Sequence, residues 1–218
     1  MNPAVIAALV TAAAVAGLVR PVLLRLPEPV DTEDKKPYAA LPTPGFVAGC
    51  ALLAGLGVAV AGLTLTWSIQ PLWWVLSSFG VLLAGIDART TWLPLVVTRW
   101  AWLAMAVGAL GSLALGAGGW VLFRVSAGAA VAGLLYLLFW LASRGGFGFG
   151  DVRFAPLIGA AASADSWSLL LWALVLGTLV GGLHGLVRLV RGRRDSFPYA
   201  PAMLVGAYLA CVLVSGLG

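Results

Sequence analysis

Eight long apolar segments, separated by short polar or glycine-rich stretches, constrain this chain more than any other feature of its sequence. They cover residues 3–19, 45–66, 72–88, 95–115, 119–141, 152–164, 166–188 and 198–217. A helix needs about 20 apolar residues to cross the hydrocarbon of a bilayer. Segment 152–164 would cover only about 20 Å at 1.5 Å per residue, so we expect a partial span there. The pattern predicts an all-α, polytopic transmembrane helical bundle with about eight membrane segments.

The scarcity of charge excludes a water-soluble protein. Only 10% of the residues are charged, whereas a soluble domain carries about 25%. The longest polar stretch, 20–44, is too short to form a domain, so we expect one membrane-embedded domain over 1–218 with a short loop at 20–44. The net charge of +5 comes from basic residues in loops between the apolar segments, where they act as topology signals. The charge therefore does not indicate nucleic-acid binding, and the expected partner is the lipid bilayer. The oligomeric state stays open.

The basic residues are distributed asymmetrically between the loops. If the loops are numbered alternately, twelve of the 13 Lys and Arg residues fall in one set, and Arg124 alone falls in the other. Cytoplasmic loops carry the excess of Lys and Arg in membrane proteins. We therefore predict a multi-pass protein of the inner (plasma) membrane, with loop 20–44 in the cytoplasm and both termini outside.

Two acidic residues lie where acids are rare and usually functional, at the edge of the hydrocarbon. Asp87 ends the apolar stretch 81–87, and Asp151 follows the glycine-rich run 145–150. The predicted topology places both at the same depth on the cytoplasmic side. Two carboxylates held close together cannot both ionise cheaply, so one keeps its proton. The ionised carboxylate can then activate water, and the protonated one can polarise a scissile carbonyl.

The glycines before Asp151 fit this chemistry. Gly148 and Gly150 permit a positive φ and a close approach of backbone, which would let an extended peptide lie beside Asp151. Metal chemistry has little to build on, because Cys50 and Cys211 are isolated and His184 is the only histidine. We therefore predict no metal site and no cofactor.

Three stretches resemble the motifs of one family, the prepilin peptidases or type IV leader peptidases, which are GxGD-type intramembrane aspartyl proteases. Residues 86–94 (IDARTTWLP) resemble the first aspartate motif, with Leu95 where Asn is common. Residues 145–154 (GGFGFGDVRF) resemble the second, with Arg153 in place of the usual Lys. Residues 197–203 (FPYAPAM) are similar to the last-helix signature. The resemblance runs from about Gly85 onward.

The resemblance implies a membrane endopeptidase that removes the basic leader of type IV pilin precursors and related proteins at the cytoplasmic membrane boundary. Asp87 and Asp151 match the two catalytic aspartates. Gly148, Gly150 and Arg153 are expected to contact substrate, and one of Arg89, Arg144 and Arg153 could pair with an acidic residue just after the cut.

The loop at 20–44 departs from the longer members of the family. Those members carry a cytoplasmic domain there, often with two CxxC pairs that bind zinc, associated with N-methylation of the new amino terminus. Loop 20–44 contains no cysteine. The chain thus resembles the short form of the family, and the resemblance does not extend to the zinc site or to N-methyltransferase activity.

Two other readings compete with the protease. Buried carboxylates also relay protons, so a proton-coupled transporter is one alternative. We find no inverted repeat, however, and the acids lie near one membrane edge instead of the midplane used by such transporters. A non-catalytic subunit of a pilus or secretion assembly is the other alternative, and the presence of both aspartates speaks against it.

Overall fold

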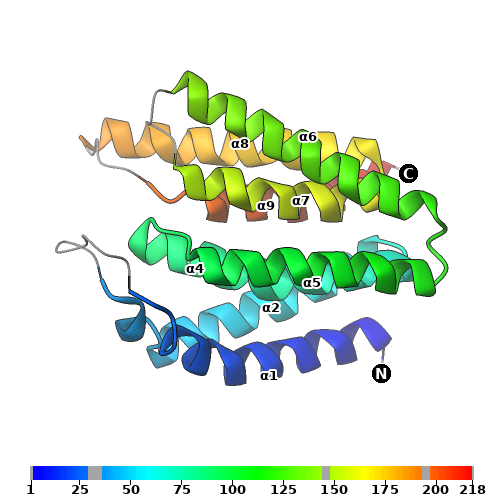
Figure 1. Cartoon of the computed structure of the whole chain (residues 1–218), viewed down its shortest axis with the longest axis horizontal. Helices are drawn as coiled ribbons and strands as arrows, with labels where there is room; N and C mark the ends of the chain where they lie inside the picture. The colour runs from blue at the N-terminus through cyan, green and yellow to red at the C-terminus, as the bar shows by residue number, and fades with distance from the viewer. Residues whose placement is uncertain (1, 29–35, 144–147, 193–196, 218) are drawn as a thin grey trace.

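The computed structural model describes residues 2–28, 36–143, 148–192 and 197–217, and the regular structure in these ranges is entirely helical. Its long helices form an antiparallel bundle (Figure 1). The α-helices are α1 (Pro3–Leu23), α2 (Pro44–Thr64), α3 (Gln70–Val75), α4 (Val81–Thr90), α5 (Leu95–Ala114), α6 (Trp120–Ala142), α7 (Phe149–Asp165), α8 (Trp167–Val190) and α9 (Ala200–Leu217). Short helices η1 (Tyr38–Ala40) and η2 (Trp67–Ile69) precede α2 and α3, and the π-helical η3 (Leu76–Gly80) joins α3 to α4.

Local sequence signals set where several helices begin. The side chain of Thr43 accepts a hydrogen bond from the amide of Phe46, and that of Ser166 accepts one from Leu169. Such caps satisfy backbone N–H groups that have no partner inside the helix. Proline follows Asn2 and Thr43 directly, where its missing N–H costs nothing.

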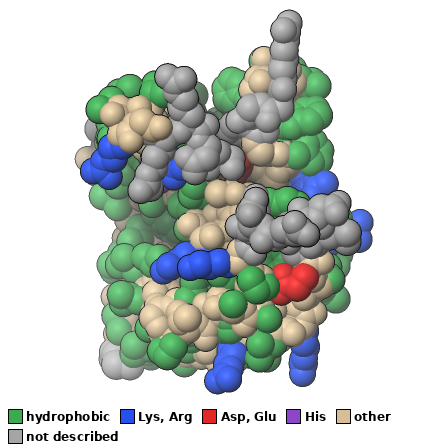
Figure 2. Space-filling model, turned by 90° about the vertical axis from the view of Figure 1, so that its left-hand side faces the viewer, with side chains coloured by type: hydrophobic (Ala, Val, Ile, Leu, Met, Phe, Trp, Pro, Cys, Tyr) green, Lys and Arg blue, Asp and Glu red, His purple; other side chains and the backbone are tan. Residues whose placement is uncertain are grey.

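The alternation of the helices brings the predicted basic loops to one end of the bundle. α1 begins and α9 ends at the right of Figure 1, while α1, α4, α6 and α8 all finish at the left. We call the left end the basic end. Figure 2 looks onto it and shows Lys and Arg side chains spread among hydrophobic and uncharged groups. Arg124 lies at the opposite end, where its guanidinium donates to the backbone oxygen of Asp165 at 2.6 Å.

Glu28 organises the part of the first loop that the structure describes. Its carboxylate accepts hydrogen bonds from the amides of Tyr38, at 3.0 Å, and Ala39, at 3.1 Å. Burial, and then the negative charge of Glu28, raises the pKa of Tyr38 to about 12. These hydrogen bonds therefore hold the two described ends of the loop together.

All eight predicted segments are helices, which confirms the all-α polytopic bundle, although about eight is a loose figure for the membrane segments. Six helices among the described residues are long and apolar enough to cross a membrane: 3–23, 44–64, 67–90, 95–114, 120–142 and 167–190. The other two long helices, α7 with 17 residues and α9 with 18, are shorter. The predicted short segment at 152–164 corresponds to α7.

α7 lies in the interior of the bundle. It packs against α5, α6, α8 and α9, and twelve of its 17 residues are buried. Its closest partner is α6: a side chain at Gly159 would collide with the backbone oxygen of Gly128. The hydroxyl of Ser163 also donates to the backbone oxygen of Arg124, at 2.7 Å. Because protein surrounds α7, its length and polarity are not limited by lipid.

Candidate active site

Asp87 lies in the last turn of α4 at the basic end, and its side chain is only 4% exposed. One carboxylate oxygen, Oδ2, accepts a hydrogen bond of 3.1 Å from the amide of Ala200, the first residue of α9. α4 ends at Thr90, and the next residue, Thr91, adopts a left-handed conformation with φ of 57°. A β-branched residue rarely adopts this conformation. The turn that follows Asp87 is therefore held by its surroundings, including the bond from the Thr91 amide to the Asp87 backbone oxygen.

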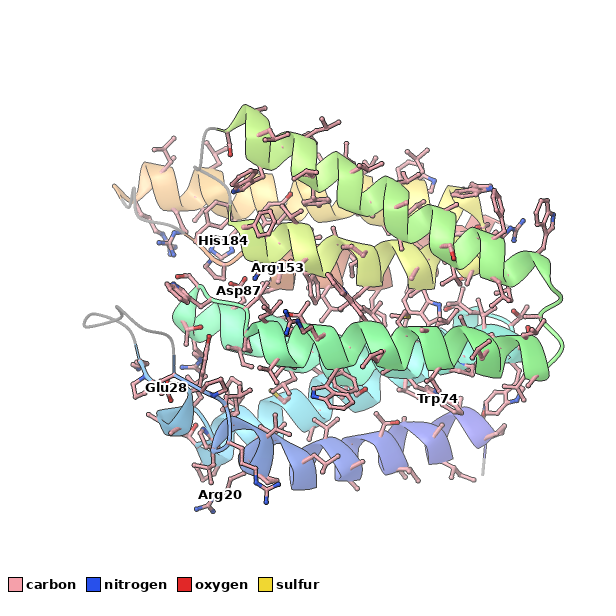
Figure 3. All side chains as sticks on the ribbon, in the orientation of Figure 1. Arg20, Glu28, Trp74, Asp87, Arg153 and His184 are labelled. Atoms are coloured by element: carbon pink, nitrogen blue, oxygen red, sulfur yellow. The ribbon has the colours of Figure 1, made fainter. Side chains whose placement is uncertain are left out.

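Asp151 is the third residue of α7 and is 6% exposed. Its Oδ1 atom is buried and has no hydrogen-bond partner among the described residues. The carboxylates of Asp87 and Asp151 are close enough for their charges to repel each other. The structure thus brings together the two acids that the sequence predicted at one depth. In Figure 3, Asp87 lies at the basic end beside the region of α7 that carries Arg153.

Neither Gly148 nor Gly150 uses the positive φ that glycine permits. Gly148 has a φ of −69°, and Gly150 is not among the glycines with positive φ. Close packing is the actual constraint. A Cβ on Gly150 would lie 3.0–3.4 Å from three side-chain atoms of Leu93, and one on Gly148 would lie 3.0 Å from Oδ2 of Asp151. Leu93, in the turn between α4 and α5, therefore covers the start of α7.

Arg153 lies two residues after Asp151 in α7 and is half-buried. Its guanidinium carbon lies 4.7 Å from the centre of the Phe149 ring, and its backbone oxygen accepts a bond of 3.1 Å from the Trp102 indole. Of the other two candidate arginines, Arg89 is exposed, and Arg144 lies outside the described residues. Arg153 is accordingly the described arginine best placed to meet a substrate near Asp151.

The start of α9 is a part of the site that residue patterns did not identify. Residues 197–203, which are similar to the last-helix signature, include Ala200, and the amide of Ala200 donates a hydrogen bond to Asp87. The preceding Tyr199 packs its ring 6.0 Å from that of Tyr136 on α6, centre to centre. No side-chain signal could reveal the Ala200 contact, because a backbone N–H makes it.

Groups able to bind metal do not gather at the aspartates. Within the described ranges, no three His, Cys, Asp or Glu residues cluster as metal ligands would. Cys50 and Cys211 are both buried as free thiols. His184 is exposed on α8, with its ring 5.6 Å from that of Phe197.

The geometry suits acid–base chemistry on a neutral substrate. Two buried carboxylates at one end of a membrane bundle form a low-dielectric site in which one can remain protonated while the other is ionised. Such a pair can deliver one proton and accept another in a single reaction, as hydrolysis of a peptide bond requires.

Comparison with known proteins gives one finding. The family model described as the type IV leader peptidase family matches residues 74–186, which is more than half of the chain. The match includes Asp87 and Asp151 and stops before α9. No curated protein and no solved structure is significantly similar to the chain.

Proposed function

Because this chain belongs to the type IV leader peptidase family, we propose that it is an aspartic endopeptidase that uses Asp87 and Asp151 to cut leader peptides from pilin-like precursors. One observation carries the proposal. The two carboxylates come from helices 64 positions apart in the chain, yet both are buried at the basic end and interact electrostatically. Their position at one end of the bundle favours proteolysis over proton-coupled transport.

The proposed reaction is a direct hydrolysis. The ionised carboxylate takes a proton from water, and the water oxygen attacks the scissile carbonyl carbon. The protonated carboxyl group gives its proton to the carbonyl oxygen. The tetrahedral intermediate then collapses and the C–N bond breaks. The leaving amine takes up the proton held by the first aspartate, and a hydroxyl of the intermediate returns a proton to the second aspartate, which leaves a carboxylic acid and restores both carboxyl groups. Acid–base groups of this kind typically contribute about 10²–10⁴-fold each.

We further propose that the site acts on the cytoplasmic face of the plasma membrane. The basic end carries the excess of Lys and Arg that marks cytoplasmic loops. A substrate whose apolar helix lies in the membrane would then present its basic leader at this end. Cysteine-accessibility labelling at Lys36, in a chain without Cys50 and Cys211, tests the orientation. Labelling from outside the cell alone would contradict it.

Arg153 is the proposed contact for an acidic residue after the cut. It lies two positions after Asp151 at the start of α7, its guanidinium stacks on the ring of Phe149, and no described acid forms a salt bridge with it. Arg153→Ala should reduce the preference for an acidic over an alanine-substituted precursor, whereas Arg89→Ala should retain it. Equal preference in wild type and Arg153→Ala would remove Arg153 from the substrate site while leaving the protease proposal intact.

The deciding experiment is co-expression with a candidate pilin precursor. The expected result is a smaller product whose new amino terminus, determined by sequencing, lies between the basic leader and the apolar helix. Asp87→Asn and Asp151→Asn variants present in the membrane at normal levels should give no product. A wild-type chain that cleaves none of a panel of such precursors would contradict the proposed function.

A further inference from the structure

The first residue of α9 is joined to Asp87 in a dry environment. Ala200 is fully buried and Asp87 is 4% exposed, so water does not compete for the 3.1 Å bond between the Ala200 amide and Oδ2 of Asp87. A backbone N–H that donates to a carboxylate forms a charge-assisted hydrogen bond, roughly twice as strong as a neutral one. The amide therefore restrains the orientation of the Asp87 side chain.

The residue before Ala200 is clamped between two other helices. The Tyr199 ring lies against Gly181 of α8, where any side chain would collide with it. On its other side, the ring centre is 6.0 Å from that of Tyr136 on α6. Because Tyr199 and Ala200 are adjacent, whatever fixes Tyr199 also fixes the direction of the Ala200 N–H.

Tyr136 connects this clamp to the second aspartate. Its side chain is 1% exposed and packs against the ring of Tyr199. Its hydroxyl interacts with the side chains of Tyr199 and Thr178 and, more weakly, with the charge of Asp151. A single buried tyrosine thus contacts the segment that holds one aspartate and interacts electrostatically with the other.

We propose that the start of α9 is a third component of the active site. In this component the Ala200 amide positions Asp87, and Tyr136 holds that amide in place through Tyr199. Ala200 and Tyr136 are positioning residues, since they act through Asp87. The catalytic meaning of this arrangement rests on the proposed function, but the arrangement itself can be tested without it.

Removal of the amide is the first test. Ala200→Pro deletes the N–H, and proline suits the first position of a helix. We expect kcat/KM for precursor cleavage to fall about tenfold to a hundredfold, as for loss of a hydrogen bond to a charged group. The control is Trp167→Pro at the start of α8, where the preceding Ser166 is extended as the residue before proline should be. This control should keep wild-type kcat/KM.

Removal of a hydroxyl is the second test. Tyr136→Phe should lower kcat about fivefold with KM unchanged, as expected for loss of one neutral polar interaction the size of a hydrogen bond. The control is Tyr208→Phe, which deletes the hydroxyl of a half-buried tyrosine, bonded at 2.6 Å to that of Ser77. Each variant removes one hydroxyl, so equal kcat values in the two would overturn the role of Tyr136.

A spectroscopic readout separates this proposal from the proposed function. The carboxyl infrared band of Asp87 is isolated as the difference between a background and its Asp87→Asn derivative. We expect the band to shift in Ala200→Pro and Tyr136→Phe and to stay in place in Trp167→Pro and Tyr208→Phe. An unshifted band in Ala200→Pro would overturn the proposal whether or not the chain cleaves a precursor. Failure of the wild-type chain to cleave would instead contradict the proposed function.

Discussion

α1 and α7 occupy opposite environments in the same bundle. α1 has 21 residues, of which four are buried, and it packs mainly against α2. An apolar groove of about 780 Å³ separates it from α5 over much of its length. α7 has 17 residues, of which twelve are buried, and it carries Asp151, Arg153 and Ser163. Of these two helices, only α1 is long and apolar enough to qualify as a membrane span.

Hydropathy therefore identifies the helices that face lipid, but it does not identify the helix that carries the residues of the candidate active site. A helix in contact with lipid must be apolar along its length, because unsatisfied polar groups are costly there. A helix enclosed by other helices can carry charged groups and a proline, provided that its neighbours fit around it.

Loss of a carboxylate at the buried start of α7 should have the largest effect. Asp151→Asn should lower cleavage at least about a thousandfold, because the amide can neither donate nor accept the required proton. Asp165→Asn, at the far end of the same helix, should leave cleavage unchanged. Precursor processing is measured by gel shift at equal protein levels. Near-normal cleavage by Asp151→Asn would exclude it as a catalytic residue.

Added bulk should destabilise α7 but not α1. Gly159→Leu forces a side chain against the backbone of Gly128 on α6 and should cost about 3 kcal/mol or more. Gly17→Leu on α1 meets no atom within 4 Å and should change stability by less than about 0.5 kcal/mol. Thermal unfolding in detergent compares the two variants. Equal midpoints would contradict the central position of α7.

A smaller steric change should act on the site alone. Gly150→Val pushes against Leu93, so the start of α7 must shift, and we expect cleavage to fall about tenfold while precursor is still captured. Leu93→Ala in the same chain should restore most of the loss by making room. Cleavage rates of the single and double variants test the contact. If Leu93→Ala gives no recovery, Gly150 is required for another reason.

Metal removal should have no effect. Among the described residues no cluster of ligands lies near Asp87 or elsewhere, and carboxylates alone suffice for the proposed hydrolysis. Cleavage should proceed at the same rate with and without chelator. Elemental analysis of the purified protein that finds about one zinc per chain would contradict this prediction.

Much of the molecule follows from local sequence. Apolar length predicted all eight helices, and the alternation of loops predicted that Asp87 and Asp151 would lie at one end. The expectation of about eight membrane segments was loose, since six of the helices are long and apolar enough to span a membrane, and the partial span expected at 152–164 is the 17-residue helix α7. A positive φ is not used at Gly150, where glycine instead makes room for Leu93.

The sequence by itself determined the membrane bundle, the alternation of its helices and the two acidic residues at its basic end. Hydropathy and charge act residue by residue and depend little on which helices become neighbours. Only the tertiary structure decided that α7 is enclosed, that Leu93 covers Gly150, and that Ala200 bonds to Asp87 across 113 positions. These contacts depend on backbone atoms and on the fit of side chains between helices, which become defined only when the helices pack together.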